Sequence, residues 1–177
     1  MTEDQLFKNT RLRTMTTYDL PAVMKWRNHE NIRLMMFSPK IITAEEHKNW
    51  YEKVSTNDRR HLFIFENNGR ASGFVQLTVD KPSQNAEWGF YTDPEAPKGT
   101  GKRMAEMVLE HCFNVLALHK INAQVLSFNH RSLRYHQQHA FLQEGTLREQ
   151  HFDGQNYHDI ACFGLLKKDW LSLKGIQ

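Results

Sequence analysis

The sequence predicts an α+β fold, with one mixed, mostly antiparallel, twisted sheet of about seven strands and helices on both faces. Three observations predict it. Short runs rich in β-branched and aromatic residues, bounded by turn residues, indicate strands. Longer stretches with apolar residues three and four positions apart indicate helices. These segments follow one another as βαα, βββ, α, β, α and ββ, and this order favours a single α+β domain over residues 1–177, with its core at about 11–168.

The N-terminal third predicts a strand and two helices. Arg11–Thr17 alternates as a strand does, and Asp19 or Thr17 can cap the short helix that follows. Thr43 and Glu46 form a capping box, in which each side chain accepts a hydrogen bond from the other residue's backbone N–H. The capping box marks the start of the second helix.

The remainder predicts six strands and two helices. The strands are expected at Arg60–Glu66, Ala71–Val79, Gln84–Tyr91, Ile121–Phe128, Phe141–Phe152 and Tyr157–Leu166, and the helices at about Gly99–Leu118 and Asn129–His139. Asn68-Gly69 and Asp153-Gly154 supply hairpin turns, because Asn and Gly tolerate positive φ. A helix between the fourth and fifth strands indicates a crossover connection there.

Composition limits the classes of function. Of the 177 residues, 40% are apolar and 24% are charged, which is typical of a globular protein. The net charge of +3, from 23 basic and 20 acidic residues, is too small to indicate a nucleic-acid partner. No apolar run approaches the roughly 20 residues that span a membrane. The polar start, Met1–Gln5, is unlike a signal peptide.

The cysteines and histidines point to a metal-free protein of a reducing compartment. Cys112 and Cys162 both lie in apolar surroundings, which favours buried free thiols over a disulfide. We therefore expect a cytoplasmic protein. The ten histidines lack the paired spacing of a zinc site, so no metal is expected and most histidines are expected at the surface or in the polar part of the core.

The most informative segment is Trp88–Arg103, which reads as a strand, a turn and a glycine-bearing loop that opens a helix. Gly99 and Gly101 let backbone N–H groups converge on an anion at the helix N-terminus, where the helix dipole favours negative charge. Lys98, Lys102 and Arg103 add positive charge. The segment predicts a diphosphate site, and the alternative is a tight turn with cations facing solvent. It lacks the Gly-Lys-Ser/Thr ending of a P-loop and the third glycine of a dinucleotide-binding fingerprint.

The element order, with this loop after the fourth strand, resembles the GCN5-related N-acetyltransferases (GNAT). The family's Gln/Arg-x-x-Gly-x-Gly/Ala loop falls on Ala96–Gly101, with Ala96 in place of the first residue. A second signal runs from Asn129 to Phe141. The resemblance implies that acetyl-CoA binds with its pantetheine arm between splayed strands four and five. It places the donor on Phe90, Tyr91, Thr92, Lys98, Gly99, Thr100, Gly101, Lys102, Arg103, Asn129 and Ser132.

The segment Trp26–His47 is similar to the nucleotide-sugar acetyltransferases of pseudaminic acid synthesis. Those enzymes carry an Arg-Asn-His-Pro run, and Glu30 replaces its proline here. The resemblance implies acetylation of the 4-amino group of UDP-4-amino-4,6-dideoxy-N-acetyl-β-L-altrosamine, which would connect the chain to flagellin glycosylation. It maps the acceptor onto Arg27, His29, Met36, Phe37, His47, Trp50, Thr78 and Tyr91. The aromatic residues also fit ordinary core packing, and His29 fits a residue that caps or orients the loop beside Arg27.

Acetyl transfer needs a polarised thioester, a neutral amine and a proton for the leaving thiolate. Backbone N–H groups near Phe90 and Tyr91 would polarise the acetyl carbonyl. The family's acid is a Tyr seven residues after the Asn, and His136 occupies that position here, with Tyr135 one residue earlier. His136 is the hypothesis for the general acid, Tyr135 is its alternative, and protonation by water is the third possibility. Glu87 is the candidate base, unless it is a solvated strand residue and water relays the proton.

Other functions stay open at this level. A GNAT that acetylates protein N-termini or polyamines is the runner-up, and a CoA-binding regulator without catalysis is the alternative from another class. A polyamine enzyme should show a mouth rich in carboxylates, whereas the candidate lining here is Arg27, His47 and aromatic rings. The sequence leaves open whether the chain acts alone or as a homodimer.

Overall fold

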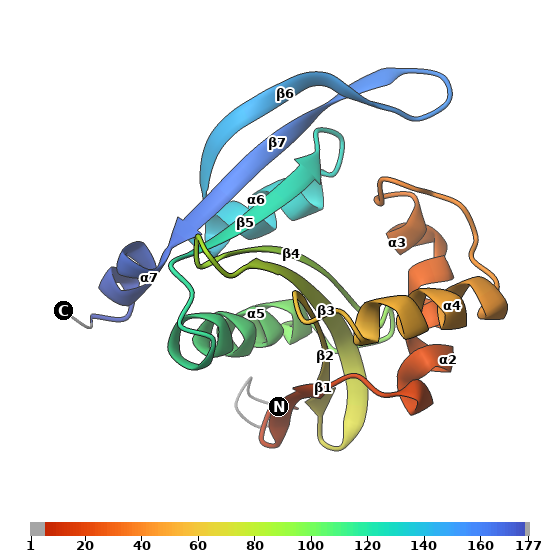
Figure 1. Cartoon of the computed structure of the whole chain (residues 1–177), viewed down its shortest axis with the longest axis horizontal. Helices are drawn as coiled ribbons and strands as arrows, with labels where there is room; N and C mark the ends of the chain where they lie inside the picture. The colour runs from red at the N-terminus through yellow and green to blue at the C-terminus, as the bar shows by residue number, and fades with distance from the viewer. Residues whose placement is uncertain (1–5, 176–177) are drawn as a thin grey trace.

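A seven-stranded sheet forms the centre of the computed structural model, which describes residues 6–175 (Figure 1). The strands are β1 (Thr10–Thr14), β2 (Arg60–Asn67), β3 (Arg70–Asp80), β4 (Asn85–Thr92), β5 (Lys120–Leu126), β6 (Leu142–Phe152) and β7 (Tyr157–Leu166). The helical elements are η1 (Thr17–Asp19), α2 (Leu20–Asn28), α3 (Glu30–Arg33), α4 (Ala44–Ser55), α5 (Thr100–Glu110), the π-helical turn η2 (His111–Val115), α6 (His130–Gln138) and α7 (Lys167–Leu173). The polar start, Met1–Gln5, lies outside the described residues.

The strand order is β1-β2-β3-β4-β5-β7-β6, and β4 pairs with β5 in parallel while the other neighbours are antiparallel. The α+β class and the mostly antiparallel sheet are therefore confirmed. α5 lies between β4 and β5 in the chain and makes the predicted crossover. A two-residue hairpin cannot join parallel strands, so this connection has to be long.

Helices cover both faces of the sheet (Figure 1). One core packs α2 and α4 against β2 and β3 through Val23, Trp26, Val54, Ile64 and Phe74. The larger core lies on the other face, where α5, η2, α6 and α7 meet the sheet. Phe65, Leu77, Met104, Val108, Phe113, Ile121 and Phe163 are almost completely buried there. The apolar periodicity of the sequence corresponds to these two cores.

Strands β4 and β5 diverge after three residue pairs. The parallel register joins Asn85 to Lys120, Ala86 to Ile121 and Glu87 to Asn122, whereas β4 continues to Thr92 and β5 to Leu126. The expected splay of strands four and five is therefore confirmed. Beyond Glu87 the two strands leave a gap in the middle of the sheet.

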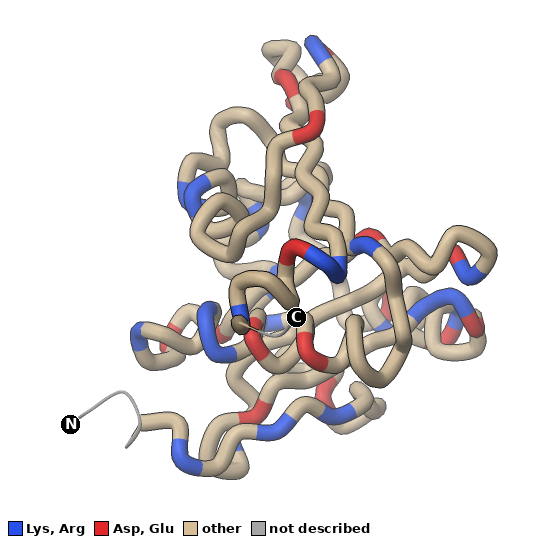
Figure 2. Tube along the Cα trace, turned by 90° about the vertical axis from the view of Figure 1, so that its left-hand side faces the viewer, with Lys and Arg blue, Asp and Glu red and all other residues tan. Residues whose placement is uncertain are grey.

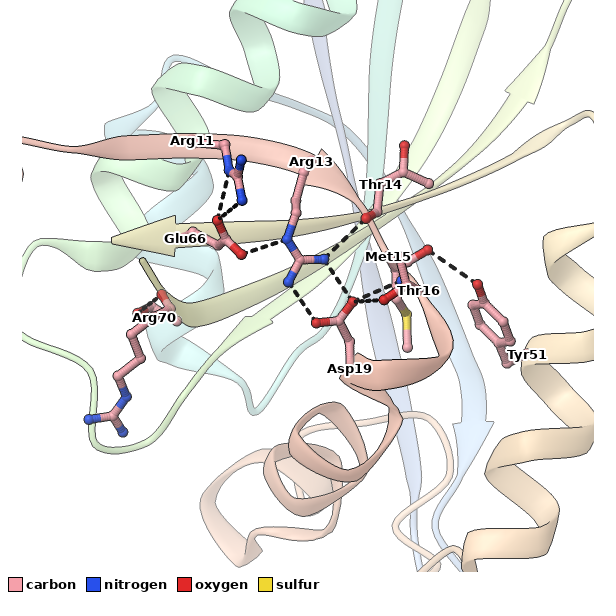
Figure 3. Close-up of polar contacts among 10 residues, drawn as sticks. Arg11, Arg13, Thr14, Met15, Thr16, Asp19, Tyr51, Glu66 and Arg70 are labelled. Carbon is pink, nitrogen blue, oxygen red and sulfur yellow. Dashed lines mark hydrogen bonds and ion pairs between the residues drawn. The ribbon is translucent and has the colours of Figure 1, made fainter. Parts of the chain in front are cut away.

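A charged network fixes the N-terminal strand to the sheet and to α2 (Figure 3). Arg13 donates to both carboxylate oxygens of Asp19, at 2.7 Å each, and to Glu66 at 2.5 Å. Glu66 also accepts from Arg11 at 2.8 Å, and Tyr51 on α4 donates to the Met15 carbonyl at 3.2 Å. Asp19 and Glu66 are both buried, so the pairing with arginine offsets the desolvation of two carboxylates.

The predicted capping box and the predicted Asn68-Gly69 hairpin turn are both present in the structure. Thr43 Oγ1 accepts from the Glu46 N–H at 3.1 Å and Glu46 accepts from the Thr43 N–H at 2.7 Å, as a capping box requires. Asn68 and Gly69 have φ of 51° and 78° in the β2–β3 hairpin.

α3, α7 and the π-helical end of the α5 segment were not expected. η2 forms because the Leu116 N–H bonds the His111 carbonyl at 3.0 Å, five residues back, and apolar periodicity cannot report that change.

Candidate active site

The gap between β4 and β5 exposes backbone groups of alternate β4 residues. The His119 N–H donates to the Gln84 carbonyl at the closed end of the gap, and the Asp93 N–H donates to the Ser72 carbonyl of β3. Because successive residues of a strand point their backbone groups to opposite edges, the Phe90 N–H faces the gap and the Tyr91 N–H faces β3. Phe90 is thus the backbone donor placed to polarise a carbonyl in the gap.

The N-terminus of α5 presents backbone donors rather than a side-chain cap. Gly99 is the N-cap residue with φ of 94°, a left-handed value that favours glycine, and no side chain caps the helix. Thr100 points inward, is 2% exposed and donates to the Pro97 carbonyl at 2.8 Å. Arg103 pairs with Glu106 at 3.1 Å, and Lys98 is exposed. The first-turn N–H groups are therefore the donors that could hold an anion here, since the Thr100 hydroxyl is committed to the loop itself.

Asp93 stabilises the turn that leads into this loop. Its carboxylate accepts from Arg70 at 2.9 Å and from the Glu95 N–H at 3.0 Å, and its side chain is buried. Arg70 lies at the start of β3, so the ion pair ties the β2–β3 hairpin to the turn. Asp93 was not among the expected site residues, although Asp before Pro is a recognisable turn signal.

The N-terminus of α6 lies beside the α5 loop. Asn129 caps α6, with Oδ1 accepting from the Ser132 N–H at 3.1 Å. The Tyr135 hydroxyl donates to the Gly101 carbonyl at 2.7 Å, and its ring lies 4.8 Å from that of Phe90. Burial raises the pKa of Tyr135, so its hydroxyl stays protonated. Tyr135 thus connects α6 to the N-terminus of α5.

His136 is a buried, neutral imidazole. Its side chain is 2% exposed, Nε2 accepts from Trp88 Nε1 at 3.1 Å, and Nδ1 lies 2.8 Å from the Ser132 carbonyl, to which it donates in this tautomer. Burial lowers the pKa of His136 to about 4, although the bond to the Ser132 carbonyl opposes this shift. Both ring nitrogens are occupied and the ring is uncharged at neutral pH. The geometry therefore argues against His136 as the general acid, despite its position in the family pattern.

Glu87 and Thr78 lie together, away from the other acceptor candidates. They are opposite each other on β4 and β3, and Arg60 of β2 donates to the Thr78 hydroxyl. Tyr91 is four residues further along β4, about 13 Å at the usual rise of a strand. Glu87 is exposed on the same face of the sheet as Tyr91, so it can reach an amine at Tyr91 only through water.

The other residues expected to bind the acetyl acceptor cluster around Arg27 on α2. Burial lowers the pKa of Arg27, Tyr91 opposes this shift, and Arg33 adds to it as a like charge. His47 is buried, stacks on Trp50 with ring centroids 5.1 Å apart, and has its pKa lowered by burial. Trp50 meets Phe74, whose ring lies 5.2 Å from that of Tyr91. The structure thus brings four of the expected acceptor residues together: Arg27, His47, Trp50 and Tyr91.

Arg27 has an unusual hydrogen-bonding state. Its Nη2 donates to the Ser38 carbonyl at 2.5 Å. Its Nη1 is buried and has no hydrogen-bond partner among the described residues. A buried donor without a partner costs about 1–3 kcal/mol, so such atoms in native proteins call for an explanation.

The remaining residues expected to bind the acceptor lie outside the cluster around Arg27. Phe37 is 47% exposed in the segment between α3 and α4, and its ring contacts His151 of β6 rather than Trp50. Met36 is half-buried in the same segment. His29 ends α2 and lines a cavity of about 40 Å³ against the Asp93–Glu95 turn.

Comparison with known proteins is consistent with this architecture. Residues 9–141 match the acetyltransferase (GNAT) domain family.

The chain belongs to the GNAT acetyltransferase family.

An uncharacterized N-acetyltransferase, YokL, derived from the SPbeta prophage of Bacillus subtilis is 32% identical over 131 residues, which cover 72% of this chain and 73% of YokL. The acetyltransferase PseH of Campylobacter jejuni is 25% identical over 127 residues, covering 72% of this chain and 79% of PseH. The spermidine N-acetyltransferase of Vibrio cholerae, solved with CoA and spermine, superimposes with a TM-score of 0.85 at 25% identity and covers 93% of this chain and 99% of that one.

This GNAT protein is therefore an acetyl-CoA-dependent N-acetyltransferase. The open gap between β4 and β5 and the uncapped N-terminus of α5 fit the pantetheine arm and the pyrophosphate of the donor. In the part of the chain that the structure describes, no three or more His, Cys, Asp or Glu residues are grouped to hold a metal ion. Within residues 6–175, no helix has the length and apolarity to cross a membrane. Cys112 and Cys162 are free thiols, and burial raises the pKa of Cys112 to about 12.

Proposed function

We propose that this GNAT transfers acetyl to the 4-amino group of a UDP-linked amino-deoxy sugar, with UDP-4-amino-4,6-dideoxy-N-acetyl-β-L-altrosamine of pseudaminic acid synthesis as the candidate acceptor. The unpartnered Nη1 of Arg27 carries the proposal. A guanidinium presents a fork of donors that matches phosphate oxygens, so a diphosphate would satisfy this atom. The likeness to Campylobacter PseH is a second support.

The charge around Arg27 also favours an anionic acceptor. Arg33 is close enough to lower the pKa of Arg27, and His47 is near enough for Arg27 to lower its pKa in turn. The carboxylate paired with Arg33 is Glu30, at 3.5 Å and largely exposed. A polyamine cation would meet like charges here, and such contacts cost free energy. Figure 2 shows basic and acidic residues interspersed along the trace, so the preference arises locally at Arg27.

Direct transfer in a ternary complex follows from this arrangement. The neutral sugar amine attacks the thioester carbonyl, whose oxygen the Phe90 N–H stabilises, the C–S bond breaks, and water relays the amine proton toward Glu87. Holding amine and thioester together supplies a large part of the acceleration. Because His136 is neutral and fully bonded, we assign protonation of the CoA thiolate to water. Glu87 would act as base through water, given its distance from Tyr91 along the strand.

A polyamine acceptor is the second candidate. The spermidine N(1)-acetyltransferase of Vibrio cholerae is 25% identical over 91% of this chain, and PseH is 25% identical over 72%. Sequence likeness therefore supports a polyamine acceptor about as well. The two candidates differ in the charge that the acceptor must bring to Arg27.

A thiol-release assay against three acceptor classes tests the proposal. Acetyl-CoA is incubated with UDP-amino-sugars, spermidine or spermine, and N-terminal peptides. We expect rapid release with a UDP-4-amino sugar alone. Arg27→Lys should lower kcat/KM for it about 10-fold or more, since a single ammonium nitrogen cannot replace two guanidinium nitrogens that bond the Ser38 carbonyl and a phosphate oxygen. Arg11→Lys, on the exposed edge strand β1, is the matched control and should act like the wild type. Release with polyamines instead, unaffected by Arg27→Lys, would favour the second candidate.

A further inference from the structure

Four aromatic rings form a row from the α3–α4 segment to the end of β5. The centroid of Phe37 lies 5.7 Å from that of His151, His151 lies 6.4 Å from His158, and His158 lies 4.7 Å from Phe128. We call Phe37, His151, His158 and Phe128 the ring row. All three spacings are within the range of interacting aromatic pairs. In Figure 1 the tip of the β6–β7 hairpin extends above the α3–α4 segment, on the same side of the end of β5.

A bulge in the β6–β7 hairpin sets the positions of His151 and His158. The β6–β7 register shifts between Leu147 and His151, and Glu149 has φ of 51° with its N–H bonded to Asp159 Oδ1 at 2.8 Å. A bulge of this kind re-aims the side chains that follow it and is often found beside active sites. After the bulge, His151 and His158 are directly opposite on the two strands.

Asp153 fixes the orientation of His158. Its Oδ2 lies 2.6 Å from His158 Nε2, and its Oδ1 accepts from the Gln155 and Asn156 N–H groups at 2.7 and 2.8 Å. The backbone bond from Asn156, followed by the bond from His158, lowers the pKa of Asp153 to about 2. The carboxylate is therefore ionised at neutral pH, and the ring of His158 is held in place before any ligand arrives.

Side chains of α2 and α3 hold the α3–α4 segment, which carries Phe37, in place by hydrogen bonds. Arg27 donates to the Ser38 carbonyl, Arg33 donates to the Pro39 carbonyl at 3.3 Å, and Asn28 exchanges two hydrogen bonds with Ile42 at 2.8 and 2.9 Å. Phe37 precedes Ser38 and leaves about half of its surface exposed. The ring row therefore begins next to the residue whose carbonyl accepts from Arg27 Nη2, while Arg27 Nη1 has no partner among the described residues.

We propose that the ring row binds the nucleobase of the acceptor while Arg27 binds its diphosphate. This proposal rests on the proposed function. A ligand with an anion at Arg27 and an uncharged planar ring beyond it satisfies both features, and a nucleotide has this composition. Base-to-aromatic stacking contributes about 1–3 kcal/mol per base. A linear polyamine has no planar ring to stack on the ring row.

The test compares Phe37→Ala and His151→Ala with Tyr157→Ala. Tyr157 is 65% exposed on the same hairpin and contacts Phe152 rather than the ring row. Each full-length variant is assayed by thiol release with the UDP-linked amino sugar and with the same amino sugar as its 1-phosphate, which lacks uridine. UMP binding is measured separately by calorimetry.

We expect Phe37→Ala and His151→Ala to lower kcat/KM for the UDP-sugar about 10-fold, mainly through KM, and to leave the sugar 1-phosphate unchanged. Both should weaken UMP binding, and Tyr157→Ala should behave as the wild type. Equal losses with both acceptors, or no loss with the UDP-sugar, would overturn the nucleobase site. A wild type that transfers to no UDP-sugar yet binds UMP through the ring row would refute the proposed function and support the site. A wild type that does not bind UMP refutes the site.

Discussion

At the scale of single residues, the buried imidazole of His136 links stability to pH. Burial lowers its pKa to about 4 from an ordinary value near 6.5. A protonated ring would place a new N–H against the Trp88 N–H, which already points at Nε2. The unfolded chain therefore binds a proton more readily than the folded one between these two values.

The pH dependence follows from that difference. The stabilisation from neutral His136 is fully present above about pH 6.5 and is lost as the pH falls toward 4. At about 1.4 kcal/mol for each pKa unit, the free energy of unfolding should fall by at most about 3 kcal/mol across this range. Urea titrations at pH 7, 5.5 and 4.5 measure it. His136→Asn should show a flatter profile, and equal slopes in both proteins would contradict the prediction.

Tyr135 offers a second test at the residue scale. Its hydroxyl bonds the Gly101 carbonyl at the anion site, so its removal should disturb donor binding more than proton transfer. We expect Tyr135→Phe to raise KM for acetyl-CoA several-fold and to change kcat less than about threefold, since one neutral hydrogen bond is worth about 1 kcal/mol. Steady-state kinetics with both substrates varied separate the two constants. A fall in kcat of about 100-fold would identify Tyr135 as the acid.

At the scale of elements, the geometry of the α5 N-terminus depends on one residue, Gly99, in the left-handed backbone conformation. Gly99 has φ of 94°, so Gly99→Ala forces an alanine into a conformation that costs about 1 kcal/mol or more. A shift of the loop to relieve this strain would also move the first-turn N–H groups. We expect both stability and the affinity for CoA to fall.

Gly69→Ala is the matched control for Gly99→Ala. Gly69 also has positive φ, at 78°, and nothing lies within 4 Å of the added Cβ. It should lose similar stability in thermal unfolding and keep full CoA affinity in calorimetry. If both variants lose CoA affinity equally, the effect is one of global stability rather than of loop geometry.

The same elements show which features the sequence can predict. The capping box at Thr43, the Asn68-Gly69 hairpin and the α5 loop were predictable because each depends on residues within four positions of one another. The ring row depends on residues more than a hundred positions apart. One signal was available: His151 and His158 flank the predicted Asp153-Gly154 turn, so a hairpin there brings them opposite each other.

At the scale of the whole molecule, the order of elements along the chain and the family were predictable, and the roles of side chains were less so. The glycine loop and the order of elements predicted the family and its acetyl-CoA donor. The family resemblance placed Thr78 and Tyr91 in one acceptor pocket, with Glu87 as the candidate base, whereas the structure separates Thr78 and Glu87 from Tyr91 along the strands. His136 matched a family position, but no spacing pattern reports that Trp88 and the Ser132 carbonyl occupy both of its nitrogens.

The early divergence of β4 and β5 divides the sheet into two mechanical halves. One half comprises β1–β4 with α2 and α4, the other comprises β5–β7, and three residue pairs join them within the sheet. A donor molecule lying along the gap would act as an added strand that couples the halves. The acetyl group would then rest at the hinge itself, where small rotations of one half change its distance to an amine bound beside Arg27. Loading the donor would in this way stiffen the protein before the acceptor arrives.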